Sequence, residues 1–322
     1  MSTKPLASTA AHWEEYWRDG SSGGEILGGE GGSRSLDAFW RRFLGERDFA
    51  PPDLALDVAS GAAPIARLAL AEFPAERRPR FICADYAPAA LASARRMLGA
   101  AIEGVACDAR ALPFRELSFS GVVSQFGLEY VGNDGFSAAA RMVARGGRLA
   151  AIIHYRGGAI ETECAENARV VGLIAGAGLI ASARKALRKT YEGPKGGGVH
   201  AKSEKAFAAA LDDANAALMR SPASTGRGLS LRYAGDIAQL AARRFAFAPE
   251  DAYEWLKGVE ARLDAYSKRM TSMVAAARSS ADMTDIKLRL ESDGLEAISF
   301  APLTFRPGDP PGAWTLEARR PA

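Results

Sequence analysis

The sequence predicts an α/β fold in which a mostly parallel sheet of seven strands is closed by an antiparallel hairpin and interrupted by a large helical insertion. Short apolar runs alternate with helical patterns from about residue 54 to 155, which is typical of parallel sheets with helices on both faces. An almost purely helical pattern follows to about residue 285. Strand-like runs then return over residues 286–322.

Five short apolar runs are the predicted parallel strands. They occupy residues 54–58, 80–84, 103–107, 120–125 and 148–154. Their apolar residues are consecutive, as expected for strands that are covered on both faces. The helical patterns between them lie at residues 63–73, 88–99 and 134–144. Residues 51–156 are therefore predicted to form the ligand-binding core.

The closing hairpin is predicted within residues 286–322. A helix over 286–294 precedes an apolar run at 296–305, a turn rich in proline and glycine, and a second run at 313–319. Two runs joined by a turn indicate a hairpin that closes the edge of the sheet.

Residues 1–50 are predicted to form a helical lid. An aromatic helix is expected over 12–18 and an amphipathic helix over 36–44. The glycine- and serine-rich stretch 20–33 between them is expected to be mobile unless a ligand orders it.

The insertion, residues 157–285, is too long to be a simple connection. Apolar residues recur at helical spacing over 207–218, and again over 256–273 after Pro249, which suits a first helical turn. The apolar stretch 168–183 is shorter than the roughly 20 residues that span a bilayer, so we expect a buried helix that could line a substrate pocket.

Basic residues are concentrated within the insertion. They are Arg184, Lys185, Arg188, Lys189, Lys195, Lys202 and Lys205. A charge run usually marks a solvated face, and attraction of an anionic substrate or a membrane surface is the alternative.

The composition argues against several classes of protein. The net charge of +3 over 322 residues is too small to indicate a nucleic-acid binder. The three cysteines are widely spaced and offer no metal-ligand pattern, which fits a reducing cytoplasm. The first residues lack an apolar signal core, and no integral membrane segment is expected.

Three aspartates fall at or near the ends of successive predicted strands, where open α/β sheets bind ligands. Asp57 precedes a turn at Gly61, which lets the backbone approach a ligand closely. An acid here repels a pyrophosphate and suits an ammonium group, as in the methionine half of S-adenosylmethionine. Asp85 is then placed for the ribose diol. Asp108 and the amide of Ala109 are placed for adenine.

The same segments resemble class I S-adenosylmethionine-dependent methyltransferases, which have a Rossmann-like fold. The similar motifs are Asp57-Val-Ala-Ser-Gly61, Asp85-Tyr86, Asp108 to Phe114, Ser124 to Tyr130 and Ala144 to Arg148. The resemblance covers about residues 50–155 and, more weakly, 287–319. It is strongest to the small-molecule branch that includes quinone-biosynthesis and malonyl-carrier methyltransferases, and it implies S-adenosylhomocysteine as the product.

One position departs from the pattern of that family. Ala62 and Ala63 stand where its members often carry threonine and glycine. Alanine disfavours a positive φ, so we expect the left-handed residue of the turn to be Gly61.

The residues expected to bind the cofactor come from the strand ends and the aromatic helix. They are Asp57, Ala59, Gly61, Asp85, Tyr86, Asp108, Ala109, Gln125, Phe126, Trp13 and Tyr16. The aromatic helix either folds over the cofactor and offers ring faces to the sulfonium, or simply docks on the core.

Methyl transfer from a sulfonium needs alignment and exclusion of water, and needs a general base only where the nucleophile carries a proton. His154, after the fifth strand, is a candidate base because imidazole accepts protons near neutral pH. Glu129 and Tyr130 are further catalytic candidates, which could bind an amine or carbonyl group of the acceptor, and Tyr155 and His200 are expected to bind the substrate. The simpler alternatives are a hydrogen-bonded histidine at a strand end and residues that cap a turn.

The predicted function is in-line methyl transfer from S-adenosylmethionine to a small metabolite or lipid-like acceptor. The fourth-strand motif lacks the Asp/Asn-Pro-Pro-aromatic signature of enzymes that methylate nucleic-acid amines or glutamine, which disfavours those substrates. A non-catalytic S-adenosylmethionine-binding protein and an NAD(P)-dependent oxidoreductase are the alternatives.

Overall fold

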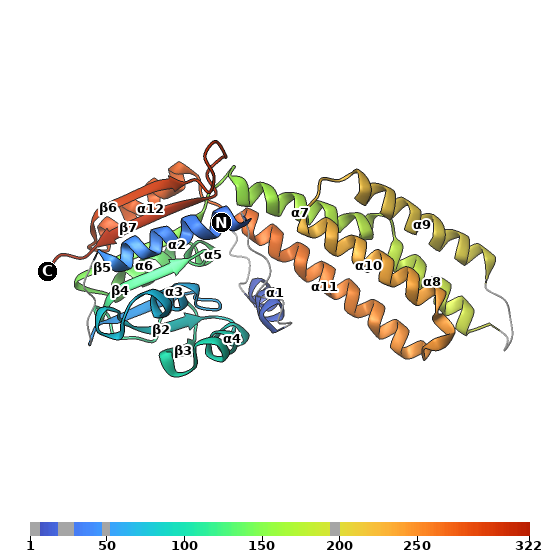
Figure 1. The fold of residues 1–322 in the computed structure, drawn as a ribbon, viewed down its shortest axis with the longest axis horizontal. Helices are drawn as coiled ribbons and strands as arrows, with labels where there is room; N and C mark the ends of the chain where they lie inside the picture. The colour runs from blue at the N-terminus through green and yellow to red at the C-terminus, as the bar shows by residue number, and fades with distance from the viewer. Residues whose placement is uncertain (1–6, 19–28, 47–51, 194–199) are drawn as a thin grey trace. The chain divides into compact units, whose positions relative to one another are not determined.

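The computed structural model describes residues 7–18, 29–46, 52–193 and 200–322, and its centre is one mixed sheet of order β3-β2-β1-β4-β5-β7-β6 (Figure 1). The strands are β1 (Leu54–Val58), β2 (Arg80–Asp85), β3 (Ile102–Ala106), β4 (Phe119–Gln125), β5 (Val143–His154), β6 (Glu296–Leu303) and β7 (Ala313–Arg319). Strands β1 to β5 are parallel, and β7 runs antiparallel between β5 and β6. The predicted fold class is confirmed.

Helices of the sheet unit begin and end near the predicted positions, with two differences. They are α1 (Ala7–Arg18), α2 (Gly29–Gly45), α3 (Pro64–Glu72), α4 (Pro88–Leu98), α5 (Leu128–Val131), α6 (Asn133–Met142) and α12 (Ser280–Ser292), with 3-10 turns η2 (Ala75–Arg77) and η3 (Gly99–Ala101). Helix α12 starts before residue 286 because Ser279 and Asp282 form a capping box. Residues 29–33, expected to be mobile, belong to α2, whereas residues 20–28 of that stretch lie outside the described residues.

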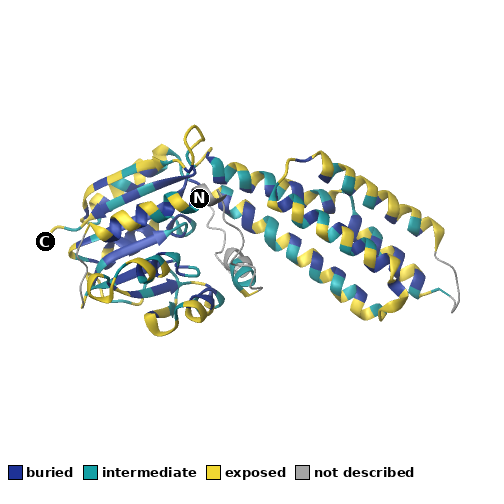
Figure 2. Ribbon diagram, in the orientation of Figure 1, coloured by how far each residue is buried: buried dark blue, intermediate teal, exposed yellow. Residues whose placement is uncertain are grey.

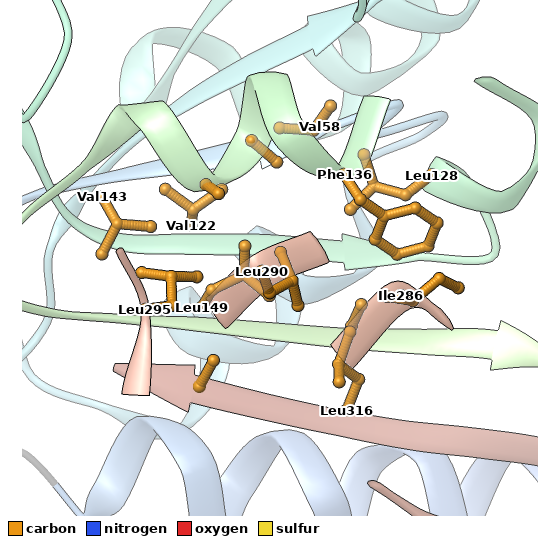
Figure 3. Packing of buried hydrophobic residues seen from close by; sticks show 14 of the residues in the cluster. Val58, Val122, Leu128, Phe136, Val143, Leu149, Ile286, Leu290, Leu295 and Leu316 are labelled. Carbon is orange, nitrogen blue, oxygen red and sulfur yellow. The ribbon is translucent and has the colours of Figure 1, made fainter. Parts of the chain in front are cut away.

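Helices cover both faces of the sheet. On one face, side chains of α6 and α12, including Phe136, Ile286 and Leu290, join the strand residues of the core cluster in Figure 3. Arg148 alternates with Leu149 on β5, so it points to the other face. There its guanidinium lies 4.4 Å from the ring centroid of Phe43 on α2. The strand ends that carry the predicted site are therefore held between two packed layers.

The second compact unit is Glu163–Thr271, a set of helices inserted in the chain between β5 and β6. Its helices are α7 (Ala159–Gly176), α8 (Leu179–Tyr191), α9 (Ala201–Arg220), α10 (Thr225–Ala242), η4 (Arg244–Ala246) and α11 (Pro249–Ala276). The predicted stripes face the interior: Phe207, Ala214 and Leu218 of α9 are buried, as are Leu256, Val259 and Leu263 of α11 (Figure 2).

The apolar stretch 168–183 is not the single helix that we expected. Helix α7 ends at Gly176, and α8 begins at Leu179 after Gly178 adopts a left-handed conformation with φ of 65°. Glycine takes this conformation without steric cost, which explains a break inside an otherwise apolar run.

One segment passes a test for membrane-spanning helices by its length and composition alone. It is Ala159–Tyr191, and 44% of its most apolar window is buried inside the fold. Core helices of soluble proteins pass the same test, and this segment is divided between α7 and α8. The finding is therefore weak support for a membrane span.

The turn between β1 and α3 contains three left-handed residues, two more than expected. Besides Gly61, with φ of 54°, Ala59 and Ala63 adopt φ of 53° and 55°. A left-handed conformation costs a residue with a Cβ roughly 1–2 kcal/mol, so the surroundings of the turn must enforce it. The expectation that Gly61 alone would carry the positive φ is wrong.

We expect Ala59→Gly to raise the free energy of unfolding by about 0.5–1 kcal/mol, because relief of steric strain exceeds the added entropy of the unfolded chain. Ala62→Gly is the matched control. Ala62 lies in the same turn without a positive φ, so the substitution should lower the free energy of unfolding by a similar amount. Urea denaturation followed by tryptophan fluorescence measures both. An equal loss of stability in the two variants would contradict the assignment.

Candidate functional site

Asp57 is a buried carboxylate at the centre of the sheet. It lies on β1 between Cys83 of β2 and Val123 of β4, and only 1% of its surface is exposed. Neither oxygen has a hydrogen-bond partner among the described residues. Burial, and secondly the nearby carboxylate of Asp85, raise the pKa of Asp57 well above its usual value. Because an isolated buried charge is costly, this position is suited to a cationic ligand.

Asp85, at the end of β2, fixes the turn that follows β1. One of its oxygens accepts the amide of Gly61 at 2.8 Å, and the other accepts the amide of Ala87 at the same distance. Burial raises the pKa of Asp85, although these hydrogen bonds act against the rise. Each oxygen retains a further lone pair for a ligand hydroxyl. The next residue, Tyr86, is 53% exposed.

Asp108 follows β3 and is already paired. Its two oxygens accept hydrogen bonds from the guanidinium of Arg110 at 2.5–3.1 Å, and one also accepts the Arg110 amide at 2.9 Å. Arg110 lowers the pKa of this carboxyl. Ala109 packs beside the core cluster. The Asp108 pair is exposed to solvent, so a ligand amine can compete for it at little energetic cost.

The end of β4 approaches the turn after β1 very closely. The hydroxyl of Ser124 donates to the carbonyl of Val58 at 2.8 Å and accepts the amide of Leu128 at 3.3 Å. A Cβ on Gly127 would lie 2.6 Å from the Cβ of Ala59, a distance that real Cβ atoms do not tolerate. Ser124 and Gly127 both lie within the fourth-strand motif of the sequence, but neither was predicted to have a role. A glycine two residues after the strand end was the available signal.

Gln125 and Phe126 diverge at this strand end. Gln125 accepts a hydrogen bond from the Trp40 indole of α2 at 2.6 Å, so its amide oxygen serves the packing of that helix. Phe126 is left-handed, with φ of 53°, and its ring centroid lies 4.4 Å from that of His154. Gln125 therefore helps to hold helix α2, whereas Phe126 packs on His154, although both were predicted to contact the cofactor.

Glu129 and His154 form a buried pair, with 2% and 1% of their surfaces exposed. One oxygen of Glu129 accepts the backbone amide of His154 at 3.0 Å and lies 2.6 Å from Nδ1 of its ring. A carboxylate only accepts hydrogen bonds, which assigns the proton to Nδ1 and leaves Nε2 as an acceptor. Nε2 is buried without a partner among the described groups.

Tyr130, which was predicted, and Arg278, which was not, contact this pair. The ring edge of Tyr130, a predicted site residue, packs on His154 with centroids 5.8 Å apart. Arg278 donates from its guanidinium to the carbonyl of Glu129 at 2.6 Å, and its amide donates to the carbonyl of His154 at 2.8 Å. Arg278 was missed because it lies far along the chain, within the predicted insertion.

Helix α1 lies over the turn after β1. The Trp13 ring meets that of Tyr130 edge-on at 5.5 Å, and Tyr16 contacts both Trp13 and Trp17. Trp17 packs on Gly61 so closely that an added Cβ would lie 2.9 Å from its ring. Glu14 accepts the amide of Ala89, in the first turn of α4, at 3.1 Å. Helix α1 therefore contacts the loop, the N-terminus of α4 and Tyr130, which packs on His154.

The remaining predicted residues have other surroundings. Tyr155 stacks on Trp314 of β7, with centroids 4.5 Å apart and planes inclined by 27°. His200 belongs to the helical unit, where its ring caps the N-terminus of α9 by accepting the amide of Ser203 at 3.3 Å. Within the described part of the chain, no group of three or more His, Cys, Asp or Glu residues could hold a metal ion.

Residues 55–147 match the family described as "Methyltransferase domain". No functionally curated protein sequence matches the chain.

Solved structures with similar folds include a complex between the Haloferax volcanii Trm112 methyltransferase activator and a methyltransferase, at 18% identity, covering 45% of this chain and 61% of the other, with a TM-score of 0.37. Geranyl diphosphate C-methyltransferase from Streptomyces coelicolor is 20% identical, with 37% and 44% covered and a TM-score of 0.33. A protein from Bordetella parapertussis is 16% identical over 90% of this chain and 68% of its own, with a TM-score of 0.44.

The chain thus spans less than two thirds of the length of the first two similar proteins. These structures are too distant to support an assignment of the family. The assignment rests on the family match, the strand order and the buried acid of β1. On these grounds, residues 55–147 carry a methyltransferase domain with a Rossmann-like fold, which is consistent with a class I S-adenosylmethionine-dependent methyltransferase.

Proposed function

We propose that the protein binds S-adenosylmethionine at the turn after β1 and transfers its methyl group to a small metabolite or lipid-like acceptor. The observation that carries this proposal is Asp57, a buried carboxylate with no hydrogen-bond partner among the described residues. The ammonium group of the methionine moiety would supply the missing positive charge and the missing donors.

The residues around Asp57 suit the rest of that molecule. Asp85 would accept the ribose hydroxyls while it holds the turn through the Gly61 amide. Asp108, Ala109 and Tyr86 would border the adenine. Trp13 and Tyr16 of α1 would cover the cofactor and offer aromatic faces to the sulfonium.

S-adenosylmethionine supplies an electrophilic methyl group when bound, and the protein's own groups then orient the acceptor and exclude water. His154 would accept the acceptor's proton at Nε2, and Glu129 would hold the ring in the required tautomer. Tyr130 and Tyr155 are the proposed acceptor contacts nearest this pair. His200 belongs to the helical unit, and its contact with the acceptor remains a prediction.

This chemistry favours an acceptor whose attacking atom carries a proton, such as a hydroxyl. An oxidoreductase that binds NAD(P) is disfavoured, because Asp57 would repel a pyrophosphate at the same turn. A non-catalytic binding protein would need Asp57 but has no use for a buried base whose acceptor nitrogen is kept without a partner. We therefore propose catalysis.

We expect Asp57→Asn to abolish S-adenosylmethionine binding while it stabilises the ligand-free protein. The neutral amide cannot pair with an ammonium, but it removes a buried charge that costs about 1 kcal/mol or more. Calorimetry measures the binding, and thermal unfolding with and without S-adenosylmethionine measures the stability. Asp53→Asn, a partly exposed aspartate just before β1, is the control. Retained binding by Asp57→Asn would refute the proposed site.

The stability of the ligand-free protein should also fall as the pH rises. Because burial raises the pKa of Asp57, the folded chain keeps a proton that the unfolded chain releases near pH 4. The contribution of this residue is therefore full below about pH 4 and is lost as the pH rises through the raised pKa. Urea denaturation at several pH values, compared with Asp57→Asn, isolates the effect. Parallel pH curves for the two proteins would contradict it.

We expect Glu129→Gln to lower the rate of methyl transfer about 100-fold with little change in S-adenosylmethionine affinity, because it disturbs the tautomer of His154 without touching Asp57. The assay follows transfer of a labelled methyl group from S-adenosylmethionine into a cell extract of small molecules and lipids. Glu116→Gln, on the exposed surface, should match the wild type. Equal loss of rate and of cofactor affinity would indicate a structural role for Glu129 instead.

A further inference from the structure

One end of the helical unit is built around the turn η4. The guanidinium of Arg244 forms two hydrogen bonds with the carboxylate of Glu204, in the first turn of α9, and one at 3.3 Å with the hydroxyl of Thr190, near the end of α8. The hydroxyl of Tyr191 donates to the carbonyl of Arg244 at 2.8 Å. These contacts join the last turn of α8, the first turn of α9 and the turn between α10 and α11 (Figure 1).

This anchored turn presents two aromatic rings to solvent. Phe245 is 74% exposed and Phe247 is 42% exposed, on either side of Ala246. Arg244 itself is buried, with 8% of its surface exposed, and the amides of Ala246 and Phe247 donate to the carbonyls of Arg243 and Arg244. The rings are therefore held outward by a fixed backbone rather than displaced from a loose core.

Basic side chains lie at the same end of the helical unit as the two rings. Exposed lysines and arginines occupy the helix ends that the Arg244 contacts bring together: Arg188, Lys189, Lys202, Lys205 and Arg243. The exposed acids at the same ends are fewer: Glu192, Glu250 and Asp251. Glu204 is neutralised by Arg244, so the surface around the rings is net positive. Part of the basic run singled out in the sequence thus lies at the same end of the helical unit as an exposed aromatic pair.

We propose that this end of the helical unit, the η4 tip formed by Phe245, Phe247 and the five basic residues, docks on the surface of an anionic lipid bilayer. Aromatic rings insert at the boundary between headgroups and acyl chains, and lysine and arginine are attracted to anionic headgroups within about a Debye length. The pairing of both features on one rigid turn matches this partner.

A protein partner fits the same surface less well. Two phenylalanines bury at most about 150–250 Å² each, and a stable protein interface needs roughly 800 Å² on each side. A membrane needs no shape-matched apolar area, because insertion of a few rings together with several basic side chains suffices for reversible binding.

The test is co-sedimentation of the full chain with vesicles of phosphatidylcholine alone and of phosphatidylcholine mixed equally with phosphatidylglycerol. We expect binding to the mixed vesicles that weakens as salt is added, and little binding to phosphatidylcholine. The double variant F245S/F247S should lose at least about tenfold in partitioning, and R188E/K189E should lose binding to the mixed vesicles.

Met219→Ser is the matched control, since Met219 is 62% exposed in the last turn of α9, at the other end of that helix. It should bind as the wild type does, and thermal unfolding should show all variants folded. Absence of wild-type binding to the anionic vesicles, or unchanged binding by F245S/F247S, would overturn the proposal. It would also be overturned if the phenylalanines instead drove self-association in size-exclusion chromatography.

Discussion

The structure of the site depends on a carboxylate that the protein buries without giving it a partner. Asp57 lies on β1, an interior strand paired with β2 and β4, and its side chain is shielded from water. Leaving a charge in this position destabilises the ligand-free fold, and the rise in its pKa expresses that cost. Affinity for a cation is obtained at the expense of stability. The surrounding turn must then be rigid enough to keep the acid where it is.

Glu129 makes the opposite use of burial. It is as deeply buried as Asp57, but its carboxylate has a permanent partner in His154, both at the backbone amide and at the ring. The two acids therefore have different roles because their surroundings differ. One awaits a charge from outside the chain, and the other fixes the proton of a neighbouring imidazole.

The sheet and the acidic strand ends were predictable because consecutive apolar runs and their spacing report directly on a parallel sheet. The packing of side chains was not. Nothing near Gln125 in the sequence indicates that Trp40 will take its amide oxygen, and Arg278 reaches the buried pair only through the return of the chain after the helical unit. The break at Gly178 was hidden by the apolar residues on both sides of it, which hydropathy treats as one helix.

The glycine-poor turn after β1 shows why local sequence rules failed there. Ala59 and Ala63 hold conformations that alanine disfavours, and partners from three segments of the chain enforce them. Asp85 binds the Gly61 amide, Ser124 binds the carbonyl of Val58, Gly127 leaves room for the Cβ of Ala59, and Trp17 covers Gly61. A turn that is fixed by its neighbours does not need glycine at every left-handed position. Its shape is therefore a property of the assembled sheet and of α1, and it could not be read from residues 57–63 alone.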